Sequence, residues 1–322
     1  MKCKKTLIAM VEDLVIIGSG PAGLTAALYG ARDGFKPLVI SGTSAGGQLL
    51  LTTTVENFPG FPDGIYGSEI IDRMRKQAEK FGARFVDGDA TAVDFSSKPL
   101  KVFVGSDVYE AFSVIVATGA SARWLGIPSE KKFIGKGVSS CATCDAAFFK
   151  NKDVIVVGGG DTAMEDSIFL TNFVNSVTVV HRRDRLRASQ IMQERAFANS
   201  KIKFIWNSVV EEILGDAKVS GVKLRNVITN EITEMKVDGV FVAVGYEPNT
   251  AIFKGQLKLD EQGYIVADEE VKTDVEGVFV AGDVADKFYR QAITAAGSGA
   301  KAALKAREFL LKLKYEQSKV QK

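Results

Sequence analysis

Two glycine-rich segments, each directly after an apolar run, constrain the fold of this chain more than any other feature. Val15-Ile16-Ile17 leads into Gly18-Ser19-Gly20-Pro21-Ala22-Gly23, and Val154-Ile155-Val156-Val157 leads into Gly158-Gly159-Gly160-Asp161-Thr162-Ala163. A strand, a turn with this spacing and a helix form the fingerprint of dinucleotide binding, because the glycines let the backbone approach a pyrophosphate. Amides at the helix N-terminus then bind the phosphates. The sequence therefore predicts two nucleotide sites.

Both halves of the chain repeat one order of elements after the glycine turn. A helix, a strand, a polar helix and a short strand precede an antiparallel meander, and a buried strand ending in glycine closes the series. The expected segments are residues 24–33, 37–40, 68–81, 84–86 and 114–119 in the first half, and 163–172, 177–180, 190–199, 203–205, 209–214, 222–227, 232–237 and 240–245 in the second. This alternation predicts an α/β protein with two Rossmann-like, three-layer (ββα) nucleotide-binding domains on parallel sheets.

A third apolar strand, residues 277–283, and a long helix over about 293–313 carry no fingerprint of their own. We expect them to return to the first domain and complete it. The second domain, residues 123–248, is then inserted into a discontinuous first domain made of 1–122 and 249–322. Two crossing segments between the domains suit a hinge.

Composition narrows the class of protein. The formal charge is 41 − 39 = +2, which is too small to indicate nucleic acid or a membrane surface as a partner. No apolar run approaches the ~20 residues that span a bilayer. Glu12 and Asp13 interrupt the apolar start of the chain, which favours a short leader on a cytoplasmic protein. Three cysteines and one histidine exclude a disulfide framework and a multi-histidine site, and we expect no metal.

The two nucleotide sites differ in the residues that follow the second strand. In the second half this segment is His181-Arg182-Arg183-Asp184-Arg185-Leu186-Arg187. Guanidinium groups suit the 2′-phosphate of NADPH, whereas an unphosphorylated ribose normally meets a carboxylate there. The alternative is a solvated basic loop. In the first half Ser41-Gly42-Thr43-Ser44 offers hydroxyls instead, and Gly46-Gly47-Gln48, Thr53, Asn57 and Gly282-Asp283 are candidates for holding a larger cofactor.

Cys141-Ala142-Thr143-Cys144-Asp145 lies between the two fingerprints. Its spacing permits a disulfide, and beside α/β units it favours redox chemistry. A helix beginning at Asp145 would stabilise a thiolate. The alternatives are half of a zinc site or two buried structural thiols. Asp145 is either an ordinary charge in the first turn of a helix or the proton donor for a thiol leaving group.

With these motifs the chain resembles the low-molecular-weight thioredoxin reductases, which depend on FAD and NADPH. The resemblance covers nearly everything from about Asp13 to the C-terminal helix. It includes Val55-Glu56-Asn57, Ala117-Thr118-Gly119-Ala120 and Arg290-Gln291-Ala292-Ile293-Thr294 besides the motifs above. Two positions depart from it: Ser44, where relatives often have Glu, and Tyr246, where many have His.

The resemblance implies a homodimer that reduces thioredoxin or a thioredoxin-like protein. Hydride would pass from nicotinamide to flavin, and reduced flavin would then open the disulfide, with rotation of the inserted domain between the two steps. By the same analogy Cys144 lies nearer the flavin, Cys141 attacks the partner's disulfide and Asp145 is the acid/base. A flavin reductase serving ferredoxin or a peroxidase, and a non-catalytic redox sensor, remain alternative hypotheses.

The expected site residues follow from the motifs and the resemblance together. The catalytic residues are Cys141, Cys144 and Asp145. The FAD site is Gly18, Gly20, Pro21, Ala22, Gly23, Gly47, Gln48, Thr53, Asn57, Ala90, Thr118, Gly119, Asp283, Arg290, Gln291 and Ala292. The NADPH site is Gly158, Gly160, Asp161, Thr162, Ala163, His181, Arg182, Arg183, Arg187 and Gly245.

Overall fold

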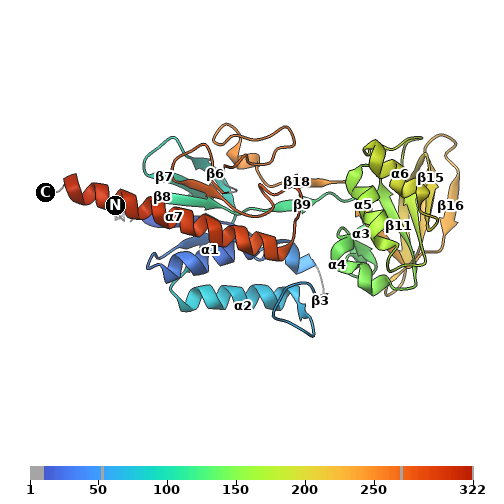
Figure 1. The fold of residues 1–322 in the computed structure, drawn as a ribbon, viewed down its shortest axis with the longest axis horizontal. Helices are drawn as coiled ribbons and strands as arrows, with labels where there is room; N and C mark the ends of the chain where they lie inside the picture. The colour runs from blue at the N-terminus through green and yellow to red at the C-terminus, as the bar shows by residue number, and fades with distance from the viewer. Residues whose placement is uncertain (1–10, 52–53, 269–270, 321–322) are drawn as a thin grey trace, which may run out of the picture. The chain divides into compact units, whose positions relative to one another are not determined.

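The computed structural model describes residues 11–51, 54–268 and 271–320 (Figure 1). These residues form two compact units. The first unit comprises the chain up to Leu50, Phe58–Ser121 and the chain from Pro248 onward. The second unit comprises Leu51–Asn57 and Ala122–Glu247. Each unit has its own sheets and its own hydrophobic core.

Five parallel strands form the centre of the first unit. Their order is β5 (Arg84–Val86), β2 (Leu38–Ile40), β1 (Glu12–Ile17), β8 (Asp107–Val116) and β19 (Val278–Val280). The start of β8 continues into an antiparallel meander with β7 (Leu100–Val104) and β6 (Ala90–Asp94). The apolar runs of β1, β2 and β8 are buried, as in parallel sheets that are covered on both faces. Residues 278–280 join this sheet from the C-terminal part of the chain.

Helices α1 (Pro21–Arg32) and α7 (Ala292–Val320) lie side by side in the first unit (Figure 1). A Cβ on Gly299 would lie 2.1 Å from the carbonyl oxygen of Ala22, so only glycine allows this close approach. Helix α7 is longer than the expected 293–313 segment. The ammonium group of Lys314 accounts for part of the extension, because it contacts the Asp13 carboxylate at 3.0 Å and the ring of Phe35.

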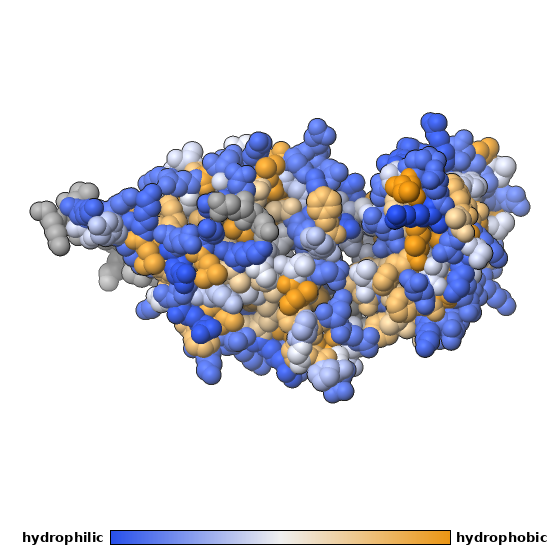
Figure 2. Space-filling model, viewed as in Figure 1, coloured by the Kyte–Doolittle hydropathy of each residue, from blue (hydrophilic) through white to orange (hydrophobic). Residues whose placement is uncertain are grey.

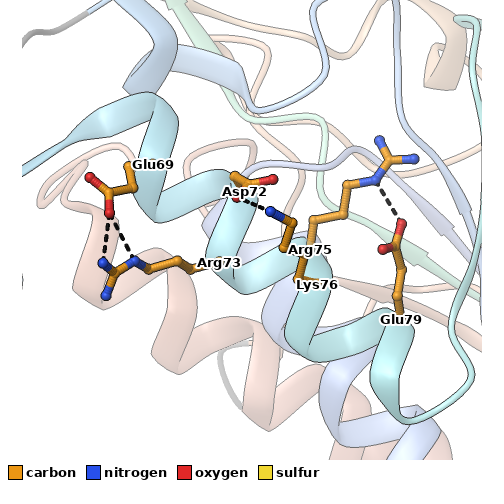
Figure 3. A network of polar contacts seen from close by, with 6 residues as sticks. All are labelled: Glu69, Asp72, Arg73, Arg75, Lys76 and Glu79. Carbon is orange, nitrogen blue, oxygen red and sulfur yellow. Dashed lines mark hydrogen bonds and ion pairs between the residues drawn. The ribbon is translucent and has the colours of Figure 1, made fainter.

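Helix α2 (Gly67–Lys80) is amphipathic, with Ile70, Ile71 and Ala78 buried. Its outer side carries ion pairs between residues four apart, shown in Figure 3: Glu69–Arg73, Asp72–Lys76 and Arg75–Glu79, at 2.6, 2.7 and 3.0 Å. Exposed pairs of this kind contribute about 0.3–0.5 kcal/mol each. Burial of the apolar side therefore fixes the helix, and the charges mainly keep its outer side hydrated.

The second unit repeats the parallel arrangement. Its strands are ordered β10 (Val138–Ser139), β17 (Gly239–Ala243), β11 (Asp153–Gly158), β12 (Ser176–Val180) and β13 (Ile202–Ile205). Its helices are α3 (Pro128–Phe133), α4 (Ala142–Asp145), α5 (Asp161–Leu170) and α6 (Gln190–Ala198). A separate antiparallel meander contains β14 (Ser208–Gly215), β15 (Val219–Asn226) and β16 (Ile232–Met235). The predicted fold class, α/β with two Rossmann-like units, is confirmed.

Strand β10 is among the elements that the sequence did not predict. It pairs with β17 as β19 pairs with β8, so it completes the second sheet at the equivalent edge. Its two residues come from before the glycine turn and not from the end of the unit. The cysteine segment therefore begins at the carboxyl end of a strand of the parallel sheet.

Two segments lead into and out of Ala122–Glu247, the main part of the second unit. They are β9 (Ala120–Ala122) and β18 (Tyr246–Pro248), which pair with each other. The amide of Asn249 donates to the Gly119 carbonyl at 3.0 Å, and the amide of Arg123 donates to the Gly245 carbonyl at 2.9 Å. The remaining short elements are β3 (Thr54–Val55), β4 (Ile65–Tyr66) and the 3-10 helices η1 (Gly47–Leu51), η2 (Ala146–Phe149) and η3 (Ala251–Phe253).

The face of the molecule in Figure 2 is mostly hydrophilic, with small apolar patches between charged side chains. Within the part of the chain that the structure describes, no helix combines the length and the apolar character that crossing a membrane requires.

Candidate active site

The first glycine turn is in close contact with the end of β8. Gly18 has φ +112°, and a Cβ on it would lie 2.3 Å from the carbonyl oxygen of Ala117. A Cβ on Gly23 would lie 2.0 Å from the carbonyl oxygen of Gly18. Glycine at both positions lets α1 begin directly on the turn, with its N-terminus at the carboxyl edge of the sheet.

Helices α1 and α5 both begin without a side-chain cap. The N-cap residues are Gly20 and Gly160, and Pro21 and Asp161 are the first helical residues. The amides of the first helical turn have no partner within the helix, so uncapped N-termini are suited to bind anionic groups. Both units therefore present backbone amides suited to a phosphate at the same place in the fold.

Ser19 connects the first glycine turn to two neighbouring segments. Its hydroxyl donates to the Ser41 carbonyl at 2.7 Å and accepts from the Gly46 amide at 3.1 Å. A Cβ on Gly47 would lie 3.8 Å from the Cα of Gly20. The structure thus brings Gly47 to the turn, with Gln48 next to it at the start of η1.

The turn after β19 reaches the same place from the other end of the chain. A Cβ on Gly282 would lie 3.0 Å from the Cβ of Ala22, and the Gly282 amide donates to the Ser298 hydroxyl at 2.8 Å. Asp283 therefore joins the group of predicted residues around the start of α1. The pKa of its carboxyl is raised to about 7, chiefly by burial and also by the Asp286 carboxylate, while the Arg290 guanidinium opposes the rise.

Two buried oxygen atoms in this group, Ser41 Oγ and Asp283 Oδ1, have no hydrogen-bond partner among the described residues. An unsatisfied buried polar atom costs about 1–3 kcal/mol, so its presence at a strand end points to a ligand with polar groups. After β2, the hydroxyl of Ser41 is buried and lacks a hydrogen-bond partner among the described residues, whereas Thr43 Oγ1 bonds to Asp89 at 2.9 Å. The sequence indicated hydroxyls here but could not choose between them.

Other predicted residues of the first unit lie on segments that surround this group. Ala90 follows Asp89, which accepts from the Thr43 amide at 2.8 Å. Thr118 Oγ1 donates to the Asn249 carbonyl at 2.9 Å, and Gly119 has φ +68°. Arg290, Gln291 and Ala292 lead into and begin α7. Asn57 is grouped with the second unit, and Thr53 lies outside the described residues.

The second glycine turn is covered by the basic loop, residues 181–187. The amide of Arg187 donates to the Gly159 carbonyl at 2.7 Å. A Cβ on Gly159 would lie 2.3 Å from the His181 ring. Asp161 accepts from the amide and the hydroxyl of Ser189 at 2.8 and 2.7 Å, and the Ser189 hydrogen bonds lower its pKa. Asp161 therefore anchors the end of the basic loop, which leaves the phosphate site to the amides and arginines.

His181 is buried at the end of β12, and its Nε2 is another atom without a partner among the described residues. Burial lowers the pKa of its imidazole, and the charges of Arg187 and Arg183 lower it further. Hydrogen bonds with the backbone at Arg185 and Gly158 raise this pKa and partly oppose the shift. A ring that is kept neutral in this way can hydrogen-bond a ligand through Nε2. The Arg182, Arg183 and Arg187 side chains are exposed around it and free to meet an anion.

The remaining residues predicted for the second site lie along the same edge of the sheet. Gly158 ends β11, Thr162 and the buried Ala163 belong to the first turn of α5, and Gly245 follows β17 with φ +111°. The site thus extends from the glycine turn in both directions along the carboxyl edge.

Cys141 and Cys144 form a disulfide directly after β10, with their Cα atoms 5.3 Å apart. Helix α4 begins at Ala142, with Cys141 as its N-cap residue. The expectation that the helix begins at Asp145 was wrong, because Asp145 ends α4 and the short η2 follows it. The hydroxyl of Ser139 explains the earlier start, since it accepts from the Cys141 amide at 3.0 Å and fixes the turn after β10.

Two residues that sequence reasoning did not include in the site position the disulfide. Ser139 also hydrogen-bonds the Asp145 carboxyl; burial raises the pKa of that carboxyl and the Ser139 bond opposes the rise. Tyr246, noticed only as a departure from relatives, donates its hydroxyl to the Ser140 carbonyl at 2.7 Å. The disulfide is therefore bordered by a carboxyl that keeps its proton to higher pH than an ordinary aspartate does.

Metal chemistry has no obvious location in the described residues. They contain no group of three or more His, Cys, Asp or Glu side chains placed to share an ion. The chemistry that the geometry supports is thiol–disulfide exchange in the second unit, and each unit has a glycine turn suited to a phosphorylated ligand.

Comparison with known proteins gives the same result at three levels. A family model described as pyridine nucleotide-disulphide oxidoreductase matches residues 12–299. A thioredoxin reductase of Streptomyces coelicolor is 55% identical over 309 residues, which are 95% of this chain and 96% of that protein. A thioredoxin reductase of Rickettsia conorii is 53% identical over 304 residues, which are 93% of this chain and 98% of that protein. A crystal structure of thioredoxin reductase from Streptococcus pyogenes superposes with a TM-score of 0.90 at 44% identity, over 94% of this chain and 99% of that one.

Proposed function

This chain belongs to the thioredoxin reductases of the pyridine nucleotide-disulphide oxidoreductase family, and on that premise we propose that it uses NADPH to reduce the disulfide of thioredoxin or of a thioredoxin-like protein. The observation that carries the proposal is the Cys141–Cys144 disulfide at the carboxyl edge of a sheet that also presents an arginine-rich nucleotide site.

The family implies a flavin and a pyridine nucleotide, and the residues present fit FAD in the first unit and NADPH in the second. In the first unit the uncapped α1 N-terminus suits the pyrophosphate, and Ser41 Oγ and Asp283 Oδ1 suit hydroxyl groups. In the second unit Arg182 and Arg183 suit the 2′-phosphate. When bound, NADPH and FAD would supply and relay the two electrons of a hydride.

The protein's own part of the chemistry is the handling of thiols and protons. Reduction of the Cys141–Cys144 bond takes two electrons and two protons and leaves two thiols. By family analogy, the Cys141 thiolate attacks the partner's disulfide, a mixed disulfide forms, and Cys144 then displaces the partner as a dithiol. The thiolate that leaves in each exchange needs a proton, and Asp145, whose pKa is raised by burial, is placed in the same segment to supply it.

We also propose that the first unit is the FAD domain and the inserted unit the NADPH domain, and that the protein is a cytoplasmic homodimer. The match with the reductases over most of the chain supports the first part. Sedimentation of the purified flavoprotein tests the homodimer, since a monomeric mass at micromolar concentration would contradict it.

The test of the proposed function is NADPH oxidation with thioredoxin as the acceptor. Cys144→Ser and Cys141→Ser should each lower disulfide turnover by about 1,000-fold or more, because the exchange requires both sulfur atoms. Cys3→Ser changes the cysteine that is not part of this pair; it is the matched control and should keep full activity. Undiminished disulfide reduction in Cys144→Ser would contradict the proposal. If NADPH oxidation proceeds with ferredoxin or a peroxidase as the acceptor but not with thioredoxin, and both cysteine variants keep that activity, the alternative flavin reductase is favoured.

A further inference from the structure

Trp206 follows β13, the strand beyond β12 in the second sheet. The strands β11, β12 and β13 are neighbours in this order. The glycine turn follows β11 and the basic loop follows β12, so the next position along the carboxyl edge belongs to residues 206–208. Ligands of open α/β sheets bind along this edge, and the position of Trp206 is therefore one step beyond the 2′-phosphate site.

The backbone holds Trp206 beside the basic loop. The amide of Ser208 donates to the His181 carbonyl at 3.0 Å, and the amide of Asn207 donates to the Arg183 carbonyl at 3.2 Å. The rings of Trp206 and His181 meet edge to face, with their centroids 6.3 Å apart and their planes at 82°. The indole is thus in contact with the residue whose Nε2 lacks a partner among the described side chains.

Two phenylalanines hold the indole in a fixed orientation. Phe204 stacks on Trp206 with centroids 5.2 Å apart and planes at 7°, as expected for residues two apart on one face of a strand. Phe197 of α6 lies against both rings. Trp206 is half-buried, so part of its surface stays accessible. A large aromatic surface that is supported from behind and open beside a phosphate loop is the arrangement that stacks a nucleobase.

On the basis of the proposed function, we propose that Trp206 recognises the adenine base of the pyridine nucleotide and forms the outer wall of its pocket. A nucleotide whose pyrophosphate is at the α5 N-terminus and whose 2′-phosphate is at the basic loop has its base attached to that same ribose. The base is therefore delivered to the end of β12 or β13. Stacking there contributes affinity without charge, in addition to what the arginines provide.

Tryptophan fluorescence tests this inference directly, since the chain has two tryptophans, Trp124 and Trp206. The probe is adenosine 2′,5′-bisphosphate, which carries the base and the 2′-phosphate but no nicotinamide that could accept energy from indole. In the FAD-loaded Trp124→Phe variant, where Trp206 is the reporter, we expect saturable quenching. In FAD-loaded Trp206→Phe the Trp124 emission should stay constant.

Affinity measured by calorimetry gives the second readout. Trp206→Ala should bind the bisphosphate about 5- to 150-fold more weakly, the range found when base-stacking aromatic residues are truncated. Trp206→Leu keeps apolar bulk without an aromatic face and should lose affinity in the same direction. Ile232→Ala truncates an apolar side chain that is 55% exposed on β16 of the separate meander; it is the matched control and should change affinity by less than about 3-fold.

The salt dependence of binding distinguishes stacking from a disturbed loop. If Trp206 contacts the base, the variants should keep the wild-type salt dependence, because the arginine contacts are unchanged. Wild-type affinity in Trp206→Ala and Trp206→Leu would overturn the inference. A loss of affinity in which the salt dependence of binding is also lost would overturn it too. Failure of the wild-type flavoprotein to bind the bisphosphate and NADPH would instead contradict the proposed function.

Discussion

The two nucleotide-binding units share a scaffold and differ at two positions on it. The first sheet runs β5-β2-β1-β8 with β19 beyond β8, and the second runs β13-β12-β11-β17 with β10 beyond β17. In each, a glycine turn joins the central strand to an uncapped helix. The shared part is suited to bind a phosphate in both units and does not predict different ligands for them.

The differences lie after the second strand and after the edge strand. After the second strand, the first unit has the unpartnered hydroxyl of Ser41, and the second has His181 and the arginines. After the edge strand, the first unit has Asp283, and the second has the Cys141–Cys144 disulfide. One scaffold thus acquires two different tasks through side chains at equivalent strand ends, as expected when function is carried by sites and not by folds.

The third position of the fingerprint should give the largest difference between the units. Gly23→Ala places a methyl group where it collides with the Gly18 carbonyl, whereas the second unit already has Ala163 at this position. We expect Gly23→Ala to lower the free energy of unfolding by about 3 kcal/mol or more and to release the flavin. The matched change Ala163→Gly should cost about 1 kcal/mol. Thermal melts and flavin content measure both, and equal effects of the two variants would contradict the account.

The buried carboxyl of Asp283 should make stability depend on pH. Its folded-state pKa is about 7, raised by burial, so its contribution to stability is complete at low pH and is lost as pH rises toward and through 7. Flavin-free Asp283→Asn should therefore match the wild type near pH 4 and exceed it at pH 8, by on the order of 2–4 kcal/mol. Asp145→Asn should shift in the same direction in the second unit. Parallel stability curves for wild type and Asp283→Asn across this pH range would contradict the assignment.

The basic loop should make only the second site selective for a phosphorylated ribose. The double variant Arg182→Gln, Arg183→Gln should bind NADPH about 10- to 100-fold more weakly and leave NADH binding nearly unchanged, because the lost hydrogen bonds are charge-assisted. Arg185→Gln removes one positive charge from the same exposed loop and is the control. An equal loss for both nucleotides would mean that the arginines do not read the 2′-phosphate.

The smallest effect concerns the contact beside the disulfide. Tyr246→Phe removes the hydrogen bond to the Ser140 carbonyl, which is worth about 0.5–1.5 kcal/mol. Disulfide turnover should fall about 2- to 10-fold, while the rate of flavin reduction by NADPH stays constant. Tyr315→Phe, at an exposed position on α7, is the matched control. A slower first step with normal disulfide exchange would place Tyr246 in the nucleotide site instead.

Sequence reasoning predicted the elements whose positions depend on apolar runs and glycines that are close together in the chain. The strand β1 and the turn at Gly18 are determined by neighbouring residues, and the sequence located both; the helix expected at residues 24–33 begins earlier, at Pro21. The short strand β10 has two residues and no periodic pattern, so only its pairing with β17 shows it. The sequence therefore could not show that the cysteine segment starts at a sheet edge.

The same limit applies to the polar contacts of the site. Ser41 lies beside Ser19 and Val86, which are distant from it in sequence. The hydroxyl of Ser41 becomes significant only because it is buried without a partner among the described residues. Burial is a property of the folded chain, and the serine pattern of the sequence does not reveal it.

The most direct test of the central claim is an anaerobic titration of the purified protein with NADPH, followed through the visible flavin absorbance. The account predicts a yellow protein that consumes about two equivalents per chain, one for the flavin and one for the Cys141–Cys144 bond, and about one equivalent in Cys144→Ser. A protein that is colourless and cannot be reconstituted with FAD, or a wild type that stops at one equivalent, would contradict it.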